Sequence, residues 1–484
     1  MNGSADRVDG VETMSAAAAA DEIPDDATIG VSGFGSVGYP KAVPLALAES
    51  GRDLELTIIS GGSVGEEIDT ALVEADAISR RFPYQARSES RAGANDGTIA
   101  FHDRHISRVS DEVALGQLPT PDVALVEAVA VGEDWLIPSL SIGATPAVVE
   151  AADKVIVEVN DEIPTELREV HDVYRPDAPP NREPIPLTEP AGRIGGPEIE
   201  FDPEKLAAVV RTSRRGTPYQ FREPTDRDEQ IAANLAGFLA EEVEENDVFD
   251  EELRLQFGVG NIGNALMGAL SDLDVGDRDI VYFGEVVQDG LLDMLDDGIV
   301  SAASGTSLAL SEDGQEQFFE NIDTYAESVV VRPADVSNAP EVIARMGVVG
   351  VNSALEVDVY GHANSTHVGG TRVVNGIGGS GDFNRNSLLS VTALPSTAKD
   401  GEISRIVPMV PHVDHTEHEL GIVVTEHGVA DLRGLSPRER ADELVSECAD
   451  PSFRDDLRSY LERAEEAGGH VPHDLDRAFS WTDN

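Results

Sequence analysis

Two stretches of the chain show the same order of apolar and polar positions. In the first stretch, a short apolar segment over residues 28–32 runs into Gly33-Phe34-Gly35-Ser36-Val37-Gly38. In the second, residues 253–257 run into Gly258-Val259-Gly260-Asn261-Ile262-Gly263. A short apolar run that ends in a glycine loop is typical of a buried strand that turns tightly into a helix. The repeated pattern therefore predicts an internal duplication.

A second apolar segment follows each glycine loop, over residues 54–60 in the first half and 280–283 in the second. Each of these segments meets a glycine and then acidic residues. Strands that alternate with helical stretches indicate α/β units. We predict an α/β protein made of two related α/β domains.

The chain is too long for one ordinary core. Residues 174–225 are rich in Pro, Arg and Gly, so we expect them to form a long connection along the surface. The expected domains are then residues 1–173 and residues 226–484. A helix is expected to begin near Asp226, and another after Ser436, where Ser, Pro and Glu form a capping sequence.

Charge is the strongest signal in the composition. The 484 residues include 91 Asp and Glu against 35 Lys and Arg, a net charge of −56. Such a field repels nucleic acid and anionic lipid, so we expect neither as a partner. The apolar segments oppose disorder, and the composition favours a protein adapted to a salty cytoplasm.

Nothing in the sequence indicates export or a membrane span. The alanine run at residues 16–20 has acidic flanks and no basic segment before it. Cys448 is the one cysteine, which excludes an intrachain disulfide framework. We expect a cytoplasmic protein.

The glycine loops by themselves allow a dinucleotide-binding enzyme. Both loops read GxGxxG, and Glu285 lies about where a ribose-binding acid would follow the second loop. The first loop has no matching acid, because Ser60 and Gly61 end its second segment. The glycines could also serve only tight turns. In each case, backbone N–H groups at such a turn can bind an anion or oxyanion.

Six segments, in order along the chain and including part of the second glycine loop, carry a resemblance to a known family. They are residues 258–262, 284–290, 337–343, 361–367, 375–383 and 425–434. With these segments the chain resembles the acetyl-CoA hydrolase/transferase family, which includes acetate, succinate and 4-hydroxybutyrate CoA-transferases. The resemblance departs at Gly263, where relatives often carry alanine, and at His427, where glutamine is common.

The resemblance implies that the active site lies between the two related α/β domains. It also implies a set of catalytic and binding residues. Glu285 would be the nucleophile and Glu426 would position it. The Val259 N–H, the Asn338 side chain and the Gly379 N–H would stabilise oxyanions. The residues implied to contact CoA are Gly258, Val259, Gly260, Asn261, Ile262, Asn375, Gly379 and Lys399. We expect Gly35 and Ser36 of the first loop to face a short acyl chain.

These residue types suit the transfer of CoA between carboxylic acids. A carboxylate nucleophile can accept CoA as a glutamyl thioester and so keep the energy of the thioester bond. Acyl-CoA and short carboxylic acids are then substrates, no cofactor is bound permanently, and a homodimer is expected from the resemblance. An acyl-CoA hydrolase on the same site and an NAD-dependent oxidoreductase are the alternatives. A non-catalytic CoA-binding protein is disfavoured by the presence of both Glu285 and Glu426.

Other interpretations of these residues are less specific. An acid at the end of a strand, such as Glu285, is more often a solvated turn residue, but residues 280–283 place it after a buried strand. Lys399 could be an ordinary surface lysine, although lysine is rare in this chain. His412, His415 and His418 have a spacing that can bind metal. Their surroundings suggest a loop, so we expect hydrogen bonds beside the cleft and no metal.

The net charge gives a prediction about stability. Removing salt should lower the melting temperature, because the carboxylates then repel each other over a longer distance, about 10 Å at 0.1 M against about 3 Å at 1 M. Thermal unfolding from dilute buffer to several molar salt measures this effect. A melting temperature that does not change with salt would contradict the salt-adapted interpretation.

Overall fold

The computed structural model describes residues 7–85, 87–217, 224–258, 260–271, 275–276 and 278–481. Spatial packing divides the chain into two compact units. Unit 1 comprises residues 1–220, 282–292 and 302–342, and unit 2 comprises residues 221–281, 293–301 and 343–484. The predicted segments 1–173, 174–225 and 226–484 follow the sequence duplication, and as domains they stay a prediction.

The sheet of unit 1 is mostly parallel, with the strand order β4-β3-β2-β1-β5-β7-β9. Its strands are β1 (Thr28–Val31), β2 (Leu56–Ser60), β3 (Ile78–Phe82), β4 (Ala100–Phe101), β5 (Val123–Val131), β7 (Lys154–Asn160) and β9 (Leu206–Thr212). The end of β5 also pairs with antiparallel β6 (Trp135–Pro138), which pairs with β8 (Ile199–Glu200). Strands β8 and β9 lie within the segment expected to be only a connection.

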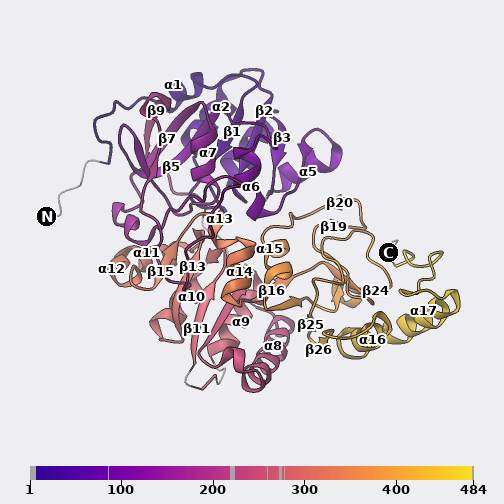
Figure 1. The fold of residues 1–484 in the computed structure, drawn as a ribbon. Helices are drawn as coiled ribbons and strands as arrows, with labels where there is room; N and C mark the ends of the chain where they lie inside the picture. Colours follow the sequence, from indigo (N-terminus) through magenta and orange to yellow (C-terminus); the bar gives the residue numbers. More distant parts are fainter. Residues whose placement is uncertain are drawn as a thin grey trace. The chain divides into compact units, whose positions relative to one another are not determined.

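Helices cover both faces of this sheet (Figure 1). Apolar residues of α1 (Ala16–Asp21), α2 (Ala42–Glu49) and α4 (Ala71–Glu74) share one core cluster with β1 and β2. Residues of α7 (Thr145–Ala151) pack with β5 and β7, and those of α6 (Ile106–Ala114) pack with β2 and β3. Because both faces are buried, the central strands are almost continuously apolar.

The second large sheet has the order β15-β13-β11-β10-β16-β21-β25-β26. Its strands are β10 (Glu252–Phe257), β11 (Asp279–Phe283), β13 (Val300–Gly305), β15 (Val329–Val331), β16 (Val349–Ser353), β21 (Leu389–Ala393), β25 (Ile422–Thr425) and β26 (Gly428–Asp431). Apart from β26, this is the order of the first sheet repeated. The pairing register is repeated as well. The last residue of β1, Val31, pairs with Leu125 of β5, and the last residue of β10, Phe257, pairs with Val351 of β16. The α/β fold is confirmed, and the matching orders support the duplication.

Several helices pack around the strands of unit 2. Helix α8 (Asp226–Glu245) begins where it was predicted, with Thr225 and Asp228 forming a capping box. It packs against α9 (Asn261–Ser271) and β25, while α15 (Ser380–Asn386) packs against β16 and β21. The helix predicted after Ser436 is α16 (Pro437–Glu443), also with a capping box, and α17 (Arg454–Ala467) follows it.

The chain also forms smaller elements. They include α10 (Asp289–Asp296), α13 (Ala334–Ser337), α14 (Pro340–Met346), the strand pair β12 (Val286–Val287) and β14 (Ser307–Leu308), the three-stranded sheet β18 (Ala363–Asn364), β17 (Glu356–Asp358) and β24 (Ile406–Val407), and the hairpins β19–β20 (His367–Val368, Arg372–Val373) and β22–β23 (Thr397–Ala398, Ile403–Ser404). Within the described part of the chain, none of the helices has the length and apolar character that a membrane crossing requires.

Each glycine loop follows a strand at which the sheet reverses its order. Strand β1 lies between β2 and β5, and β10 lies between β11 and β16. In α/β sheets such a reversal opens a crevice at the carboxyl ends of the strands, where ligands bind. Gly263 closes the second loop tightly, because a Cβ there would lie 2.4 Å from the Gly258 carbonyl oxygen.

The crevice of the first sheet is filled by the chain's own side chains. Lys41 is buried and its ammonium group donates to the Tyr39 carbonyl at 2.7 Å and to the Glu127 carboxylate. The Glu158 carboxylate accepts the N–H groups of Lys41, Ala42 and Val43 at 2.6–2.9 Å, where α2 begins. Only about 20 Å³ of space remains among the described residues there, about enough for one water molecule.

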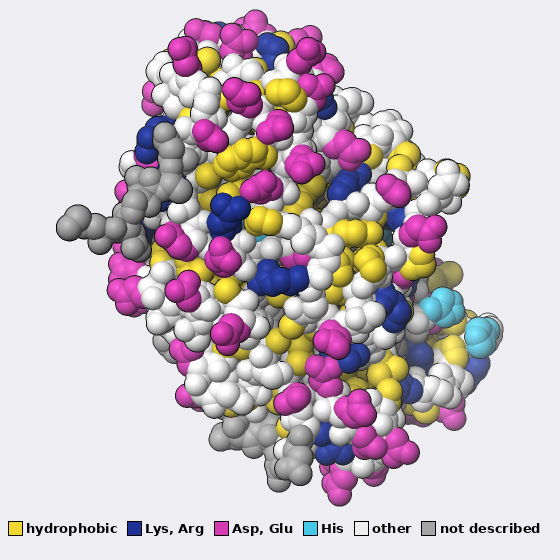
Figure 2. All heavy atoms as spheres, turned by 60° about the vertical axis from the view of Figure 1, so that its left-hand side comes forward, with side chains coloured by type: hydrophobic (Ala, Val, Ile, Leu, Met, Phe, Trp, Pro, Cys, Tyr) yellow, Lys and Arg dark blue, Asp and Glu magenta, His cyan; other side chains and the backbone are white. Residues whose placement is uncertain are grey.

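Acidic side chains are spread over the face of the molecule that Figure 2 shows, with basic side chains between them. This distribution agrees with the net charge of −56. On this face the acidic residues are therefore dispersed and not gathered in one patch.

Candidate active site

Glu285 follows the carboxyl end of β11, and its backbone is firmly held. The Glu285 carbonyl accepts the N–H groups of Thr306 at 2.6 Å and Ser307 at 3.1 Å. Just before it, the Gly284 N–H donates to the Ser304 carbonyl at 2.9 Å. These three bonds tie the turn that carries Glu285 to the turn between β13 and β14, and so fix where its side chain starts.

Asn338 lies against the Glu285 carboxylate. Its side-chain Nδ2 donates to Oε1 of Glu285 at 2.8 Å. Its Oδ1 accepts the Ser337 hydroxyl at 2.9 Å, which fixes the orientation of the amide. Asn338 is fully buried, so the amide has little freedom to turn away.

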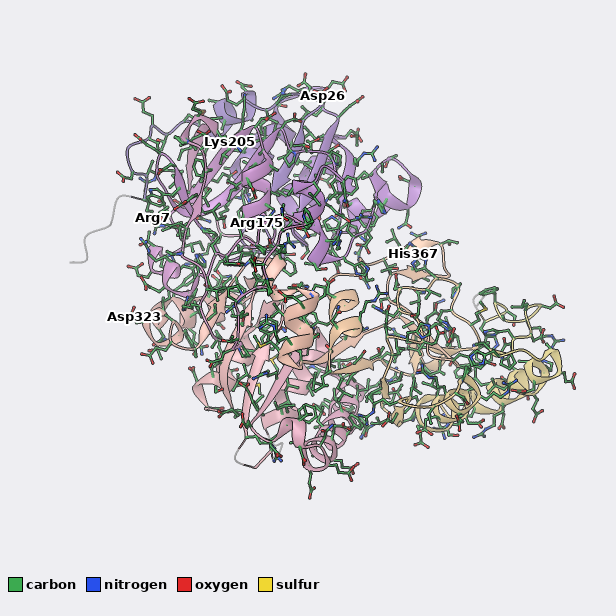
Figure 3. The ribbon with its side chains drawn as sticks, viewed as in Figure 1. Arg7, Asp26, Arg175, Lys205, Asp323 and His367 are labelled. Atoms are coloured by element: carbon green, nitrogen blue, oxygen red, sulfur yellow. The ribbon has the colours of Figure 1, made fainter. Side chains whose placement is uncertain are left out.

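The short helix α13, which ends just before Asn338, is tied to residues far away in the sequence. Asp335 of α13 forms an ion pair with Arg175 at 2.8 Å, and Arg175 also donates to Glu150 at 3.1 Å. Arg175 comes from the segment after β7 (Figure 3). Burial raises the pKa of Asp335, and the nearby Arg175 opposes that shift. The ion pair therefore offsets part of the cost of burying the Asp335 carboxyl group and holds α13 in place.

Tyr282 is a further residue beneath the Glu285 turn. Its hydroxyl accepts the Val286 N–H at 3.4 Å. Burial raises the pKa of Tyr282, and the negative charge of Glu285 raises it further. The phenol therefore stays neutral near pH 7.

Gly35 of the first loop lies beside the residues that follow Glu285. A Cβ at Gly35 would lie 3.1 Å from Oγ of Ser307, 3.4 Å from Cβ of Ala309 and 3.7 Å from Cγ2 of Val286. Its φ of +66° also favours glycine. Ser36 is next to it, and its N–H donates to the Ser63 carbonyl at 3.0 Å. The first glycine loop thus packs against the strand pair β12–β14.

Unit 2 contains a cavity of about 280 Å³ at the carboxyl ends of β10, β16 and β21. Four residues expected to contact CoA line it, namely Gly258, Gly260, Ile262 and Asn375. Gly379 and Lys399 are not among its lining residues, and Lys399 is exposed at the end of the hairpin β22–β23. Val259 and the Asn261 side chain lie outside the residues that the structure describes.

Glu426 follows β25 and is fixed by three donors. Ser396 binds it through its backbone N–H and its hydroxyl, both at 2.8 Å. Nε of Arg227 lies 3.2 Å from Oε1 of Glu426. Neither Ser396 nor Arg227 was predicted as a site residue, and no motif in the sequence points to them.

The histidines that suggested a metal site bind acidic or hydroxyl groups instead. His412 lies 3.2 Å from Asp414, in an irregular segment. Nε2 of the buried His415 lies 3.2 Å from the Ser380 hydroxyl, next to Gly379. Among the described residues, no group of three or more His, Cys, Asp or Glu side chains is arranged to hold a metal ion.

Comparisons with known proteins agree with this architecture. Residues 11–211 match the acetyl-CoA hydrolase/transferase N-terminal domain, and residues 314–461 match the C-terminal domain of that family. A succinyl-CoA:acetate CoA-transferase of Clostridium kluyveri is 42% identical over 97% of this chain and 88% of its own length. An acetyl-CoA hydrolase of Yarrowia lipolytica is 39% identical over 94% of this chain and 91% of its own length. The crystal structure of RipA from Yersinia pestis has the same fold, with a TM-score of 0.71 and 22% identity over 93% of this chain and 97% of RipA.

The ion pair of α13 gives a prediction about stability. Arg175→Ala should lower the free energy of unfolding by about 3 kcal/mol, because it leaves the buried Asp335 carboxylate without a partner. Arg168→Ala is the matched control, since Arg168 and its partner Glu198 are both more than a third exposed, and it should cost less than about 1 kcal/mol. Thermal unfolding of both variants measures the difference. Equal losses would show that the Arg175–Asp335 pair is no stronger than a surface pair.

Proposed function

The chain belongs to the acetyl-CoA hydrolase/transferase family, and we propose that it exchanges CoA between a short-chain acyl-CoA and a carboxylic acid such as acetate, through a thioester on Glu285. Membership of the family confirms the predicted enzyme class, a CoA-transferase, and the alternative of hydrolysis is found in the same family. The family does not identify the two acids.

The contact between Asn338 and Glu285 is the observation that carries this proposal. A nucleophilic carboxylate must remain ionised and keep a fixed direction of attack. The Asn338 amide is neutral, so it orients Oε1 at 2.8 Å without supplying a positive charge. The bonds from Thr306 and Ser307 to the Glu285 carbonyl hold the backbone at the same time.

The reaction proceeds in two matching halves. A Glu285 carboxylate oxygen attacks the acyl-CoA carbonyl, the carbon–sulfur bond breaks, and CoA departs as a thiolate, which leaves the acyl group joined to Glu285 in a mixed anhydride. The thiolate then attacks the carboxyl carbon of the Glu285 side chain, so the donor acid leaves as a carboxylate and the Glu285 side chain holds CoA as a thioester. The acceptor carboxylate attacks that thioester and the same two steps run in reverse, which frees Glu285 and releases the new acyl-CoA.

Each attack creates an oxyanion that needs hydrogen-bond donors. The Asn338 amide already lies at the carboxyl group of Glu285, so it can bind the oxyanion formed when the thiolate or the acceptor attacks there. A single donor of this kind contributes about 2.7–4 kcal/mol. We assign the Val259 and Gly379 N–H groups to the same task and Glu426 to the positioning of Glu285, as the family resemblance implies.

We further propose that the cavity in unit 2 receives part of CoA. Gly258 and Gly260 present backbone at the carboxyl end of β10, where α/β folds bind ligands. Asn375 adds a side-chain amide on the same cavity. Asn261, Ile262, Gly379 and Lys399 complete the proposed CoA contacts, and Lys399 would bind phosphate as a point charge.

The acyl group is proposed to lie near Gly35 and Ser36. The first glycine loop packs against Val286 and Ser307, beside the Glu285 turn, so a larger side chain at Gly35 would press on these residues. A short acyl chain suits this arrangement. We propose in addition that the enzyme works in the cytoplasm at high salt, as a homodimer and without a permanently bound cofactor.

Hydrolysis by the same residues is the second candidate, because the relative from Yarrowia lipolytica is named an acetyl-CoA hydrolase. The two activities differ only in whether water or a carboxylate attacks the glutamyl thioester. Release of free CoA from acetyl-CoA, measured with and without a carboxylic acid acceptor, separates them. A transferase needs the acceptor for sustained turnover, whereas a hydrolase does not.

The nucleophile gives a direct prediction. Glu285→Ala and Glu285→Asp should abolish transfer while CoA still binds, because CoA affinity comes from other residues and because loss of one methylene withdraws the attacking oxygen. Transfer rates with acetyl-CoA and a carboxylic acid in molar salt, together with calorimetric CoA binding, measure both effects.

Glu312→Ala is the control, since Glu312 is exposed in the first turn of α11 (Glu312–Glu320), and it should keep full activity. Auxiliary acid–base groups contribute about 10²–10⁴-fold to the rate of a reaction. If Glu285→Ala retains more than about a hundredth of the activity, Glu285 is therefore only such an auxiliary group. The assignment of the nucleophile would then be wrong.

A further inference from the structure

Arg405 is the basic residue that lines the cavity of unit 2. It lies between β23 and β24, and its backbone is bonded on both sides. Its N–H donates to the Ser396 carbonyl, and its carbonyl accepts the Val357 N–H, each at 2.8 Å. A side chain that starts from such a fixed backbone has a defined direction.

The guanidinium of Arg405 has no hydrogen bond or ion pair with any of the described residues. The two nearby carboxylates bind other groups, since Glu426 is held by Arg227 and Ser396 and Glu356 accepts the Asn364 amide at 2.7 Å. Burial, and next the positive charge of Arg227, lower the pKa of Arg405. The charge of Arg405 is therefore only partly compensated within the protein.

The second charged residue of the cavity does not compensate Arg405 either. Asp228 is buried, and its carboxylate accepts the N–H and the hydroxyl of Thr225 at 2.9 and 2.7 Å in the cap of α8. A partly buried cation without a partner is costly. In a chain with 91 acidic residues, a carboxylate partner for Arg405 would be easy to supply. None of the described residues supplies one, which indicates that the partner of Arg405 comes from a bound molecule.

We propose that Arg405 binds an anionic group of a substrate, either a phosphate of CoA or the carboxylate of the exchanging acid. The proposal rests on the function proposed above and adds a residue that the family resemblance did not single out. A planar guanidinium offers two parallel N–H donors, which match the two oxygens of a carboxylate or a phosphate. The cavity of about 280 Å³ has room for such a group beside Gly258 and Asn375.

Steady-state kinetics of Arg405→Gln and Arg405→Lys test this proposal, with Arg458→Gln as the control. Arg458 lies on α17 and its side chain is 54% exposed. Acetyl-CoA and S-acetylpantetheine, which has no phosphate, serve as donors, and propionate serves as acceptor. Arg405→Gln should raise one Michaelis constant about tenfold to a hundredfold, the effect expected for losing a hydrogen bond to a charged group. Arg405→Lys should give a smaller rise, because it keeps the charge but not the two parallel donors.

The two sources of the anion predict different patterns. If Arg405 binds a phosphate, the constant for acetyl-CoA rises and that for S-acetylpantetheine does not. If it binds the acid, the constant for propionate rises with both donors. Michaelis constants within twofold of the wild type for both variants and all substrates would overturn the proposal.

A measurement on the unmodified enzyme is independent of how the variants fold. Phenylglyoxal should label Arg405 in the free enzyme, and peptide mapping should show at least tenfold slower labelling when CoA or propionate is present at saturation. An unchanged labelling rate with both would overturn the proposal. In that case the function proposed for Glu285 would still stand if the wild-type enzyme transfers CoA. If CoA protects Arg405 but the enzyme transfers no CoA, Arg405 would still be an anion site and the proposed transferase function would be refuted.

Discussion

The hydrogen bond from the Asn338 amide to the Glu285 carboxylate is the contact on which the proposed chemistry depends. Both partners are brought to it by bonds that reach far along the chain. Glu285 is held through its carbonyl by Thr306 and Ser307. Asn338 follows α13, which begins with a bond from the Ala334 N–H to the Gly143 carbonyl and is tied by Asp335 to Arg175. A carboxylate can act as a reliable nucleophile only when its direction is fixed in this way before substrate arrives.

The equivalent crevices of the two duplicated halves differ in what occupies them. In the first sheet, Lys41, Glu127 and Glu158 fill it with an internal network. In the second sheet the matching position is open and is lined by the glycine loop, Asn375 and Arg405. The two crevices also differ in whether their basic side chain has an acidic partner. The cation of the filled crevice has a carboxylate partner in the protein, while the cation of the open one lacks a partner among the described residues.

The elements that the sequence predicted are those with a local signal. Strands β1, β2, β10 and β11 stand out as short apolar runs that end in glycine, and α8 and α16 begin at capping residues. Strand β9 was missed, although Leu206 to Val210 is apolar, because the surrounding Pro and Arg residues indicated a connection. Glu285, Asn338 and Glu426 were chosen from the family resemblance. The contact between the first two became visible only in three dimensions, and the roles of all three stay predictions.

The supporting residues had no signal in the sequence. Arg175 and Asp335 are 160 positions apart, and each looks like an ordinary charged residue in an acid-rich chain. Arg405 stands out only because the structure shows which carboxylates already have partners. Ion pairs and missing ion pairs depend on long-range packing, so a single sequence without its fold does not reveal them.

The mass of the enzyme after reaction with acetyl-CoA alone tests the central claim most directly. Without an acceptor acid, the account predicts that CoA accumulates on the protein, and that peptide mapping places it on Glu285. Borohydride added after the reaction should reduce the thioester and release CoA from the protein. An adduct that survives a reducing thiol is not a disulfide at Cys448, the one cysteine. An enzyme that transfers CoA but shows no adduct, or carries it on another residue, would contradict the account.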